Sequence, residues 1–370
     1  MVIAMYRVPS MTEIEDIPWN GYKVVSTFSG GGGSCLGYRM AGFKVVWANE
    51  FIPEAQNTYR ANHKGVFLNC KDIREVTPED VIRESGIPYG EIDLFDGSPP
   101  CASFSTAGKR EKHWGEVKQY SDTEQRVDDL FFEYARLIKG LQPKVFIAEN
   151  VSGLVKGTAK GYFKMILQSL KDCGYEVKVR LMKAKYMGVP QIRERLIFCG
   201  VRNDLVEKYD VHPVHPTAIE RIITLGEALQ GVRNDPQEVA DLLEQMKHRK
   251  AGAILRRMPK NPKQVIRGGK ITGGSFFSLS RESMYQPCST ICQMSGQEGI
   301  AGACHPLEDR KFTLEELRRI SSVPDDFVLT GKFSQRWERL GRMVPPVMMS
   351  KIAKTVQEEI LDVINGKTGK

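Results

Sequence analysis

Residues 96–101 read Asp96-Gly97-Ser98-Pro99-Pro100-Cys101 and follow the largely apolar run Ile92–Phe95. A short apolar run that ends in glycine and proline predicts a buried β-strand followed by a turn. Proline fixes φ and supplies no N–H, so this turn holds the sulfur of Cys101 in one orientation at the carboxyl end of the strand, where α/β sheets bind ligands. Two interpretations of Cys101 are open from these residues alone: a nucleophile, or a buried structural cysteine.

Similar apolar runs alternate with helix-length amphipathic segments as far as Val201, which predicts βαβ units in a largely parallel sheet. A helix is expected over Glu124–Leu141, because apolar residues recur there at helical spacing and Pro143 follows. The fold class is therefore α/β. The predicted strands are Tyr22–Phe28, Val45–Ala48, Ile92–Phe95, Val145–Ala148, Val177–Leu181 and Leu196–Cys199.

The chain has 370 residues, which favours two domains over one. Its texture changes near Asn203, after which prolines and histidines cluster at His212–Pro216 and a basic stretch runs over Lys247–Lys270. That stretch mixes cations with glycines and has no balancing acids, which suits contact with phosphates and bases, whereas the alternative is a solvated face. The formal net charge of +8 also favours a polyanionic partner.

Composition argues against several classes of protein. The eight cysteines are spread along the chain and the N-terminus lacks a secretory pattern, so a reducing cytoplasm is expected. No apolar stretch approaches the ~20 residues that span a bilayer. Cys288, Cys292 and Cys304-His305 have a spacing that fits no standard structural zinc site, so no metal is predicted.

A glycine-rich turn, Phe28–Ser34, follows the first predicted strand. In a nucleotide-binding fold such a turn lets the backbone approach the cofactor, and Glu50, at the end of the next strand, is placed to bond ribose hydroxyls. The alternative is a tight loop without a ligand. The Lys-Ser/Thr ending of a phosphate-binding loop is missing, which favours an adenosine without a triphosphate.

Two further segments carry candidate polar groups. Glu149-Asn150-Val151 closes the run Val145–Ala148, so its carboxylate is expected in the same crevice as Cys101, unless it is an ordinary helix-capping acid. Gln191–Arg195 enters the last predicted strand with arginines at alternate positions. Alternate residues project to the same side, so we expect one arginine to reach the site and the other to brace the structure.

In this order and spacing, the segments resemble the DNA (cytosine-5) methyltransferase family over nearly the whole chain. The opening motif of that family is similar to Phe28–Gly33, its nucleophile motif to Pro99–Gly108, its acid motif to Glu149–Val151, and its Gln-x-Arg-x-Arg motif to Gln191–Arg195. The ninth motif is similar to His305-Pro306, Arg310, Thr313–Glu316, Arg319-Ile320 and Pro324–Phe327, and the tenth to Gly341–Pro346.

The resemblance implies a Rossmann-like S-adenosylmethionine-dependent methyltransferase domain formed by residues 1–202 together with 328–370. It also implies a smaller target-recognition domain, residues 203–327, which includes the ninth motif. The implied partner is double-stranded DNA, and we expect a monomeric enzyme in the cytoplasm of a bacterium or a phage host.

The implied reaction gives each residue type a role. The thiolate of Cys101 adds to C6 of a flipped cytosine, which leaves electron density at C5 to attack the methyl donor. Glu149, in an acid form favoured by a dry site, stabilises the adduct through N3. Arg195 resembles the residue that holds O2, and Arg193 the residue that supports the motif. The predicted catalytic residues are Cys101, Glu149, Arg193 and Arg195.

The resemblance also implies two binding sets. Phe51 is expected to stack on adenine, and Asp72 to lie near its amino group. The predicted cofactor-binding residues are Phe28, Gly30, Gly31, Gly32, Glu50, Phe51, Asp72, Ile73, Pro100, Arg342 and Val344. The predicted DNA contacts are Ser103, Ser105, Arg256, Arg257 and Lys270.

The tenth motif departs from the family pattern, because Arg342 stands where a neutral asparagine is usual. One interpretation is that its charge pairs with the carboxylate of carboxy-S-adenosylmethionine, which predicts a cytosine-5 carboxymethyltransferase. The other is that Arg342 pairs with Glu338 or turns to a DNA phosphate. A transfer-RNA cytosine-5 methyltransferase and a catalytically inactive DNA-binding regulator are the remaining alternatives to a DNA methyltransferase.

Overall fold

The computed structural model describes residues 6–100, 118–120, 123–125, 129–155, 159–276, 278–297 and 302–367, and these divide between two compact units. The sheet unit contains residues 15–182, 194–217 and the chain from Met349 onward. The smaller unit contains the chain up to Ile14 together with residues 183–193 and 218–348. From the sequence, the domain boundaries were expected after residues 202 and 327, with residues 183–193 in the same domain as the strands on either side.

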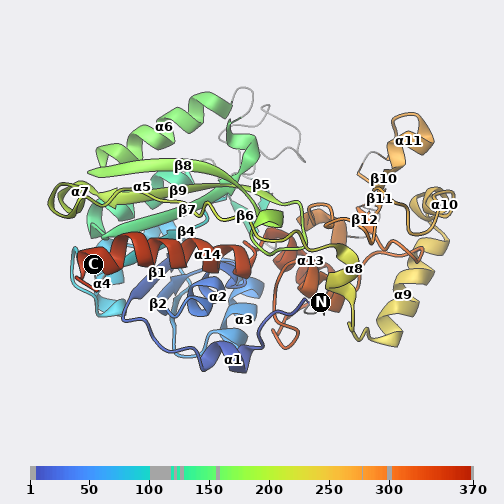
Figure 1. Ribbon diagram of the computed structural model, residues 1–370, viewed down its shortest axis with the longest axis horizontal. Helices are drawn as coiled ribbons and strands as arrows, with labels where there is room; N and C mark the ends of the chain where they lie inside the picture. The colour runs from blue at the N-terminus through green and yellow to red at the C-terminus, as the bar shows by residue number, and fades with distance from the viewer. Residues whose placement is uncertain are drawn as a thin grey trace. The chain divides into compact units, whose positions relative to one another are not determined.

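A seven-stranded sheet forms the centre of the sheet unit, in the order β3-β2-β1-β4-β7-β9-β8 (Figure 1). The pairs β1–β2, β2–β3, β1–β4 and β4–β7 are parallel, whereas β7–β9 is antiparallel. The α/β class and the largely parallel sheet are therefore confirmed. The strands are β1 (Lys23–Thr27), β2 (Lys44–Asn49), β3 (Phe67–Asn69), β4 (Leu94–Gly97), β7 (Val145–Val151), β8 (Tyr175–Lys183) and β9 (Glu194–Arg202).

Six of these strands match the predicted apolar runs, and β3 was missed. Strand β3 has only three residues, and the apolar run Val66–Leu68 is too short to distinguish a strand from a loop; Phe67 is exposed in the structure. The helix predicted to start at Glu124 begins later, as α5 (Leu130–Leu141). Thr123–Gln125 is instead strand β6, paired with β5 (Lys118–Tyr120), because the polar residues before Leu130 offer no apolar face to bury.

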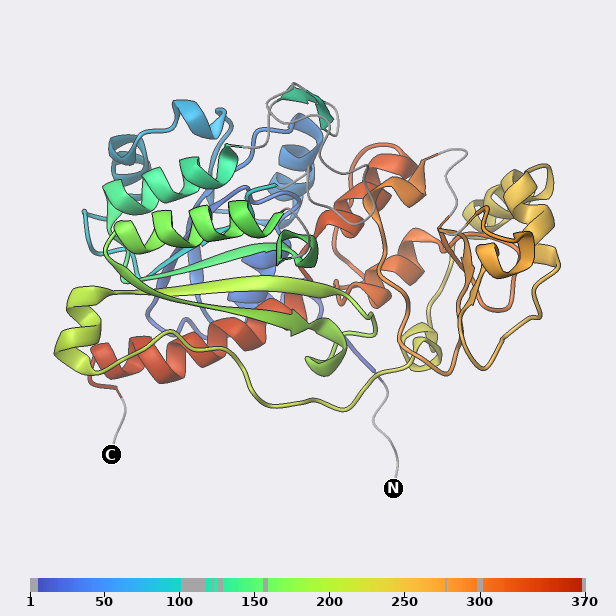
Figure 2. The same ribbon diagram turned by 90° about the horizontal axis from the view of Figure 1, so that it is seen from above.

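Helices cover both faces of the sheet. Figure 2 shows α5 and α6 on one face and the long C-terminal helix α14 on the other. Phe95 and Phe146 pack on the first face against Tyr134 of α5, and Phe198 packs there against Phe131 of the same helix. The helices that contribute to the sheet unit are α2 (Gly33–Met40), α3 (Pro53–Asn62), α4 (Pro78–Ser85), α5, α6 (Ala159–Asp172), α7 (Asn203–Tyr209), α15 (Asp362–Ile364) and most of α14 (Pro346–Val356).

The C-terminal segment returns to the first strand and so completes the sheet unit. The Tyr22 hydroxyl donates to Asp362 at 2.7 Å, and the Asn20 amide donates to Gln357 at 2.9 Å. These bonds join residues more than 300 positions apart in sequence. Met349 and the described residues after it belong to the sheet unit.

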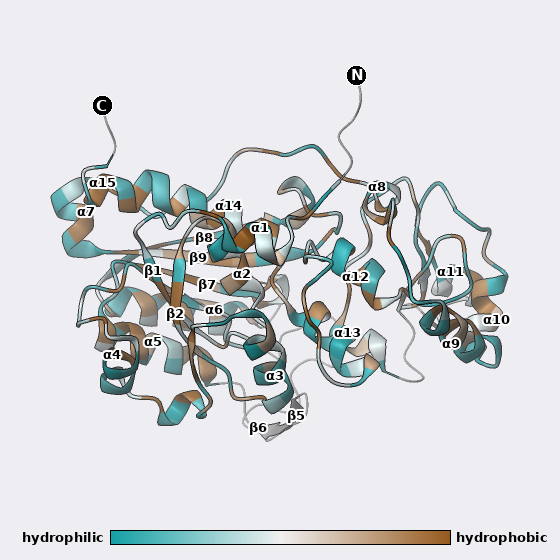
Figure 3. Ribbon diagram, turned by 90° about the horizontal axis from the view of Figure 1, so that it is seen from below, coloured by the Kyte–Doolittle hydropathy of each residue, from teal (hydrophilic) through white to brown (hydrophobic). Residues whose placement is uncertain are grey.

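The smaller unit is mostly helical, with a three-stranded sheet of short strands. Its helix α9 carries both hydrophilic and hydrophobic residues (Figure 3). Leu242 and Met246 of this helix are buried, and Met246 belongs to a small apolar core. The elements are α8 (Leu225–Leu229), α9 (Pro236–Lys247), α10 (Lys250–Arg256), α11 (Gly268–Thr272), α12 (Leu314–Ile320), α13 (Phe333–Arg342), β10 (Ile266–Arg267), β11 (Ser280–Arg281) and β12 (Ala303–Cys304); α1 (Met11–Glu15) spans the first boundary.

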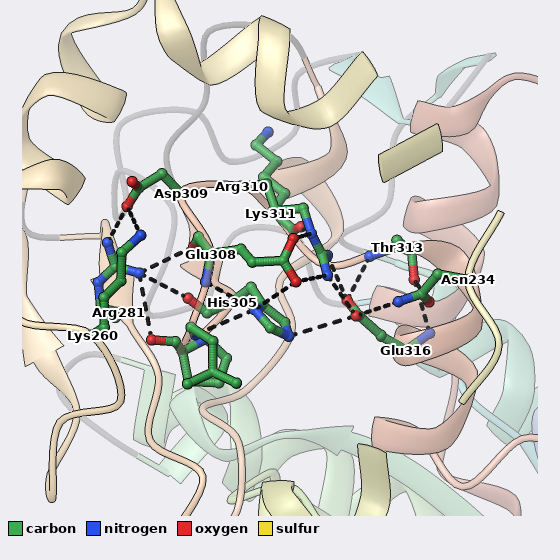
Figure 4. Close-up of polar contacts among 12 residues, drawn as sticks. Asn234, Lys260, Arg281, His305, Glu308, Asp309, Arg310, Lys311, Thr313 and Glu316 are labelled. Carbon is green, nitrogen blue, oxygen red and sulfur yellow. Dashed lines mark hydrogen bonds and ion pairs between the residues drawn. The ribbon is translucent and has the colours of Figure 1, made fainter. Parts of the chain in front are cut away.

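Buried ion pairs lie within this unit, beside its apolar residues (Figure 4). The guanidinium of Arg310 donates to both carboxylate oxygens of Glu316, each at 2.8 Å. Arg281, which is fully buried, pairs with Asp309, as does Lys260. Several of these residues belong to the segment that resembles the ninth family motif, which therefore has a structural role here.

Among the described residues, no helix is long and apolar enough to cross a membrane.

Candidate active site

The carboxyl edge of the sheet collects most of the predicted site residues. Because β1, β2, β3, β4 and β7 run parallel, the turns that follow them meet at one edge. Strand β9 runs the opposite way beside β7, so its first residues lie at the same edge. The residues brought to this edge are Phe28–Gly32, Glu50, Phe51, Asp72, Pro99-Pro100, Glu149, Asn150 and Arg195.

The turn between β1 and α2 requires glycine. Gly30 and Gly32 have φ of 55° and 91°, and a Cβ on Gly32 would lie 2.0 Å from the Nε2 atom of His63. A Cβ on Gly30, in contrast, would meet no atom within 4 Å. The turn therefore leaves open space beside its backbone on the Gly30 side, as close approach by a ligand demands.

Glu50 holds this turn in place. Its carboxylate accepts one hydrogen bond from the Gly30 N–H at 2.7 Å and another from the Ile52 N–H at 2.7 Å, at the start of α3. A carboxylate oxygen can accept more than one hydrogen bond, so these two bonds are compatible with a further role of Glu50 toward ribose hydroxyls. The structure thus places Glu50 beside the turn, as expected.

Asp72 and Ile73, which were predicted to bind the cofactor, contact other residues of the protein after the end of β3. Asp72 accepts from the backbone N–H of Arg74 at 3.0 Å and pairs with its guanidinium, which also binds Asp129 at 2.7 Å. Ile73 is buried in the apolar core, with 3% of its surface exposed. Phe51 is partly exposed, which leaves part of its surface accessible.

Glu149 and Arg195 form an ion pair at the end of β7 and the start of β9. The antiparallel register sets Glu149 opposite Ile197 and Arg195 opposite Val151, so the two side chains are diagonal neighbours on one face. Both are largely buried, with side-chain exposures of 10% and 13%. The two residues that the sequence analysis assigned to the substrate ring are therefore in direct contact.

Arg193 and Gln191 lie in the smaller unit, and their side chains form hydrogen bonds with its backbone. The Arg193 guanidinium, 1% exposed, donates to the carbonyl oxygens of Gly341 at 2.9 Å and Arg342 at 3.2 Å. The Gln191 side chain accepts from the Ile291 N–H at 3.2 Å. One arginine of the motif thus reaches the Glu149 carboxylate and the other binds backbone carbonyls, as the alternating pattern led us to expect.

In the same unit, Arg342 pairs with Glu338 one helical turn earlier, with its Nε atom 2.6 Å from the carboxylate. This matches the second interpretation of the departure in the tenth motif. The glutamate offsets the extra positive charge. Val344 is buried.

The Pro99-Pro100 turn is fastened to the neighbouring strand, because the Asn150 side chain donates to the Pro99 carbonyl at 3.2 Å. Asn150 was quoted in the acid motif, but the sequence did not indicate this bond. Cys101, Ser103 and Ser105 lie outside the described residues.

The basic stretch of the smaller unit exposes its cations. Arg256, Arg257 and Lys270 are all exposed, at the end of α10 and in α11. Arg256 donates to the Lys247 carbonyl at 3.2 Å, which orients its side chain across the loop between α9 and α10. Within the described ranges, no three His, Cys, Asp or Glu side chains gather as a metal site requires.

A buried acid beneath the site was missed. Asp96, 1% exposed, lies on β4, and burial and the charge of Glu149 raise its pKa to about 7, although hydrogen bonds from Ser26 and Tyr38 oppose the shift. Its signal was present in the sequence, since an acid closing an apolar run is unusual for a buried strand.

Comparison with known proteins identifies relatives that span most of this chain. The chain is 32% identical to the type II methyltransferase M.Eco47II of Escherichia coli and 30% identical to M.PspPI of a Psychrobacter species; the alignments cover 96% and 95% of this chain and 83% of each relative. In fold it is similar to a DNA modification methyltransferase from an Escherichia coli prophage, with a TM-score of 0.68, 20% identity and coverage of 92% and 100% of the two chains. It is also similar to DNMT2 of Spodoptera frugiperda, with a TM-score of 0.63, 16% identity and coverage of 93% and 100%.

The family comparison covers the chain from the first strand to the C-terminal helices. Residues 22–358 match the C-5 cytosine-specific DNA methylase family, whose members use S-adenosylmethionine. With the Rossmann-like sheet and the Glu149–Arg195 pair at its carboxyl edge, this match establishes that the chain is a methyltransferase belonging to the C-5 cytosine-specific DNA methylase family.

Proposed function

We propose that the protein methylates C5 of a cytosine in double-stranded DNA, with Cys101 as nucleophile and Glu149 and Arg195 holding the base. The observation that supports this most directly is the buried Glu149–Arg195 pair beside the Pro99-Pro100 turn. A carboxyl group and a guanidinium in contact offer a proton-transfer group and a fixed set of N–H donors to one edge of a planar ring.

The residues at the sheet edge fit the proposed cofactor. The open space beside Gly30 and the carboxylates of Glu50 and Asp72 suit an adenosine, whose hydroxyl and amino groups donate hydrogen bonds. When bound, S-adenosylmethionine supplies an electrophilic methyl group on a sulfonium. Glu50 orients the ribose side, and the glycine turn permits close backbone approach.

The proposed covalent step uses residues of this chain at each stage. The Cys101 thiolate forms a bond to C6, and the electron pair of the C5–C6 double bond moves toward C5 while Glu149 supplies a proton at N3. Glu50 and the Phe28–Gly32 turn would hold the donor whose methyl group passes to C5. Loss of the C5 proton to a base, departure of the thiolate and return of the N3 proton to Glu149 restore the double bond and regenerate both side chains.

Cytosine C6 is not accessible inside a duplex, so the base is flipped into the site, at a cost of a few kcal/mol that contacts to the DNA offset. We assign Arg256, Arg257 and Lys270 to the backbone of the DNA because they are exposed. Arg193 acts as a positioning residue, since its guanidinium is bonded to backbone carbonyls.

We propose unmodified S-adenosylmethionine as the donor. Recognition of carboxy-S-adenosylmethionine was assigned to the guanidinium of Arg342, and Glu338 pairs with that guanidinium. The relatives reported above are named type II methyltransferases, which favours DNA over transfer RNA as substrate.

The test combines base mapping with covalent trapping. Bisulfite sequencing of DNA from an expressing host is expected to reveal protected cytosines in one sequence context, and purified protein is expected to form a stable adduct with 5-fluorocytosine DNA. Cys101→Ala abolishes both results. Methylation that continues in the Cys101→Ala protein, or carboxymethylcytosine as the product, contradicts the proposal.

A further inference from the structure

A buried carboxyl group lies beneath the cofactor turn and is not part of the mechanism above. Asp96 of β4 pairs in register with Ser26 of β1, so both side chains project from the same face of the sheet. The Ser26 hydroxyl donates to one carboxylate oxygen at 2.8 Å. The Tyr38 hydroxyl, from α2, donates to the other at 2.9 Å.

The hydrogen-bonded chain continues into the glycine-rich turn. The Ser29 hydroxyl lies 3.0 Å from the Ser26 hydroxyl and 3.2 Å from the Ser26 carbonyl. Ser29 directly precedes Gly30, whose N–H binds Glu50. A continuous path therefore runs from Asp96 through Ser26 to the backbone expected to meet the cofactor.

Asp96 also belongs to the strand that leads into the nucleophile turn, only three residues before Pro99. Its backbone carbonyl accepts from the Thr27 hydroxyl at 3.0 Å, which adds a second link between the ends of β1 and β4. The same residue is thus bonded to the cofactor turn on one side and continuous with the Pro99-Pro100 turn on the other.

The electrostatic setting of Asp96 is unusual for a structural residue. Within the described ranges, no lysine or arginine forms an ion pair with it, and the titratable groups that face it are Glu149, Tyr38, Tyr134, Cys35 and Tyr59. All of these are neutral or acidic. A buried acid without a cation costs stability, so a functional role explains its presence better than packing does.

We propose that Asp96 is a positioning residue that, through Ser26, holds the Ser29–Gly30 turn in the conformation that binds S-adenosylmethionine. This inference rests on the proposed function, because it assumes that this turn binds that cofactor. Asp96 touches neither the cofactor nor the base in the proposal, and it acts only through the hydrogen-bonded chain.

Two single-atom deletions separate this role from a merely structural one. Ser26→Ala removes the hydrogen bond to Asp96 that continues through Ser29 into the turn. Tyr38→Phe removes the hydrogen bond that α2 donates to Asp96. Each variant deletes one hydroxyl donor from the same buried carboxyl group, so a structural role predicts equal effects on stability and on binding.

Under the proposal, Ser26→Ala weakens S-adenosylmethionine binding about fivefold, the value of one hydrogen bond, while Tyr38→Phe leaves the Kd within about twofold. Asp96→Asn also weakens binding, because its side chain has one oxygen acceptor in place of two and cannot accept from both Ser26 and Tyr38. The KM for DNA is expected to stay unchanged in all three variants.

The experiment is isothermal titration of the full-length protein with S-adenosylmethionine, together with thermal unfolding and steady-state methylation of duplex DNA. A Kd that changes equally in Ser26→Ala and Tyr38→Phe, or an Asp96→Asn protein that binds as the wild type does, overturns the inference and leaves the proposed function intact. Failure of the wild-type protein to bind the cofactor or to methylate DNA overturns the proposed function instead.

Discussion

Glu316 provides a sharp test of how the smaller unit is stabilised. It is 3% exposed and accepts from Arg310 through both carboxylate oxygens, from the Thr313 N–H at 2.9 Å and from the Asn234 amide at 2.8 Å. These bonds hold the pKa of Glu316 below its usual value, although burial opposes them. Figure 4 shows Glu316 beside Thr313 and Asn234, with dashed lines to Arg310.

Glu316→Gln keeps the shape of the side chain but removes its charge, so Arg310 retains only Glu308 as an ionic partner. Breaking a buried pair by neutralising one partner costs about 3–5 kcal/mol. The lower end applies here, because the amide oxygen still accepts and Glu308 is partly exposed. We expect a loss of about 3 kcal/mol, which lowers the unfolding temperature of a unit of this size by about 6–12 °C.

The assay is hydrogen exchange of the full chain, read in the peptides that cover residues 305–320, together with thermal unfolding. Glu244→Gln is the matched control, because Glu244 pairs with Lys247 on the exposed side of α9 and its loss is expected to change neither measurement. Equal results for the two variants, or unchanged protection at residues 305–320 in Glu316→Gln, refute the reasoning.

Three further predictions concern the sheet unit. Gly97→Ala is expected to destabilise it by about 1–3 kcal/mol in thermal unfolding, because the new Cβ would lie 2.4 Å from the Tyr134 ring; Gly161→Ala, where no atom lies within 4 Å, is the control, and equal stability of the two variants contradicts the packing argument. Burial lowers the pKa of His63 to about 3 in the folded chain, so the unfolded chain binds the extra proton first and stability falls as pH drops below about 6.5. Urea unfolding is expected to lose about 2 kcal/mol from this group between pH 7 and pH 5, and a His63→Phe protein that keeps the same pH dependence would argue against that source. Arg195→Lys keeps the charge but not the planar donor set, so we expect kcat for DNA methylation to fall at least tenfold with little change in the Kd for S-adenosylmethionine; an unchanged kcat would remove Arg195 from the site.

Much of the sheet could be predicted because its signals are local. Each run such as Val145–Ala148 is apolar on both faces, as a strand covered by helices must be, and the turns that follow carry the polar residues of the site. The location of Glu50 and Glu149 at one edge followed from strand direction alone. The resemblance supplied the roles, which no local pattern contains.

Local signals failed where burial depended on distant partners. The residues before Leu130 are mostly polar, so the apolar face of the helix begins only at Leu130, and Thr123–Gln125 pairs as a strand with Lys118–Tyr120. Strand β3 exists because β2 offers it a hydrogen-bonding edge, although Phe67 is exposed.

In the site, too, some features follow from local sequence and others depend on contacts between distant segments. The sequence alone determined which residue types follow each strand, because strand ends and glycine turns are properties of short segments. Only the tertiary structure decided that Arg195 pairs with Glu149 while Arg193 binds backbone carbonyls, and that Asp96 lies in a chain with Ser26 and Tyr38. Such contacts depend on strand register and on the helix that covers each face, and both are settled only when segments far apart in the chain pack together.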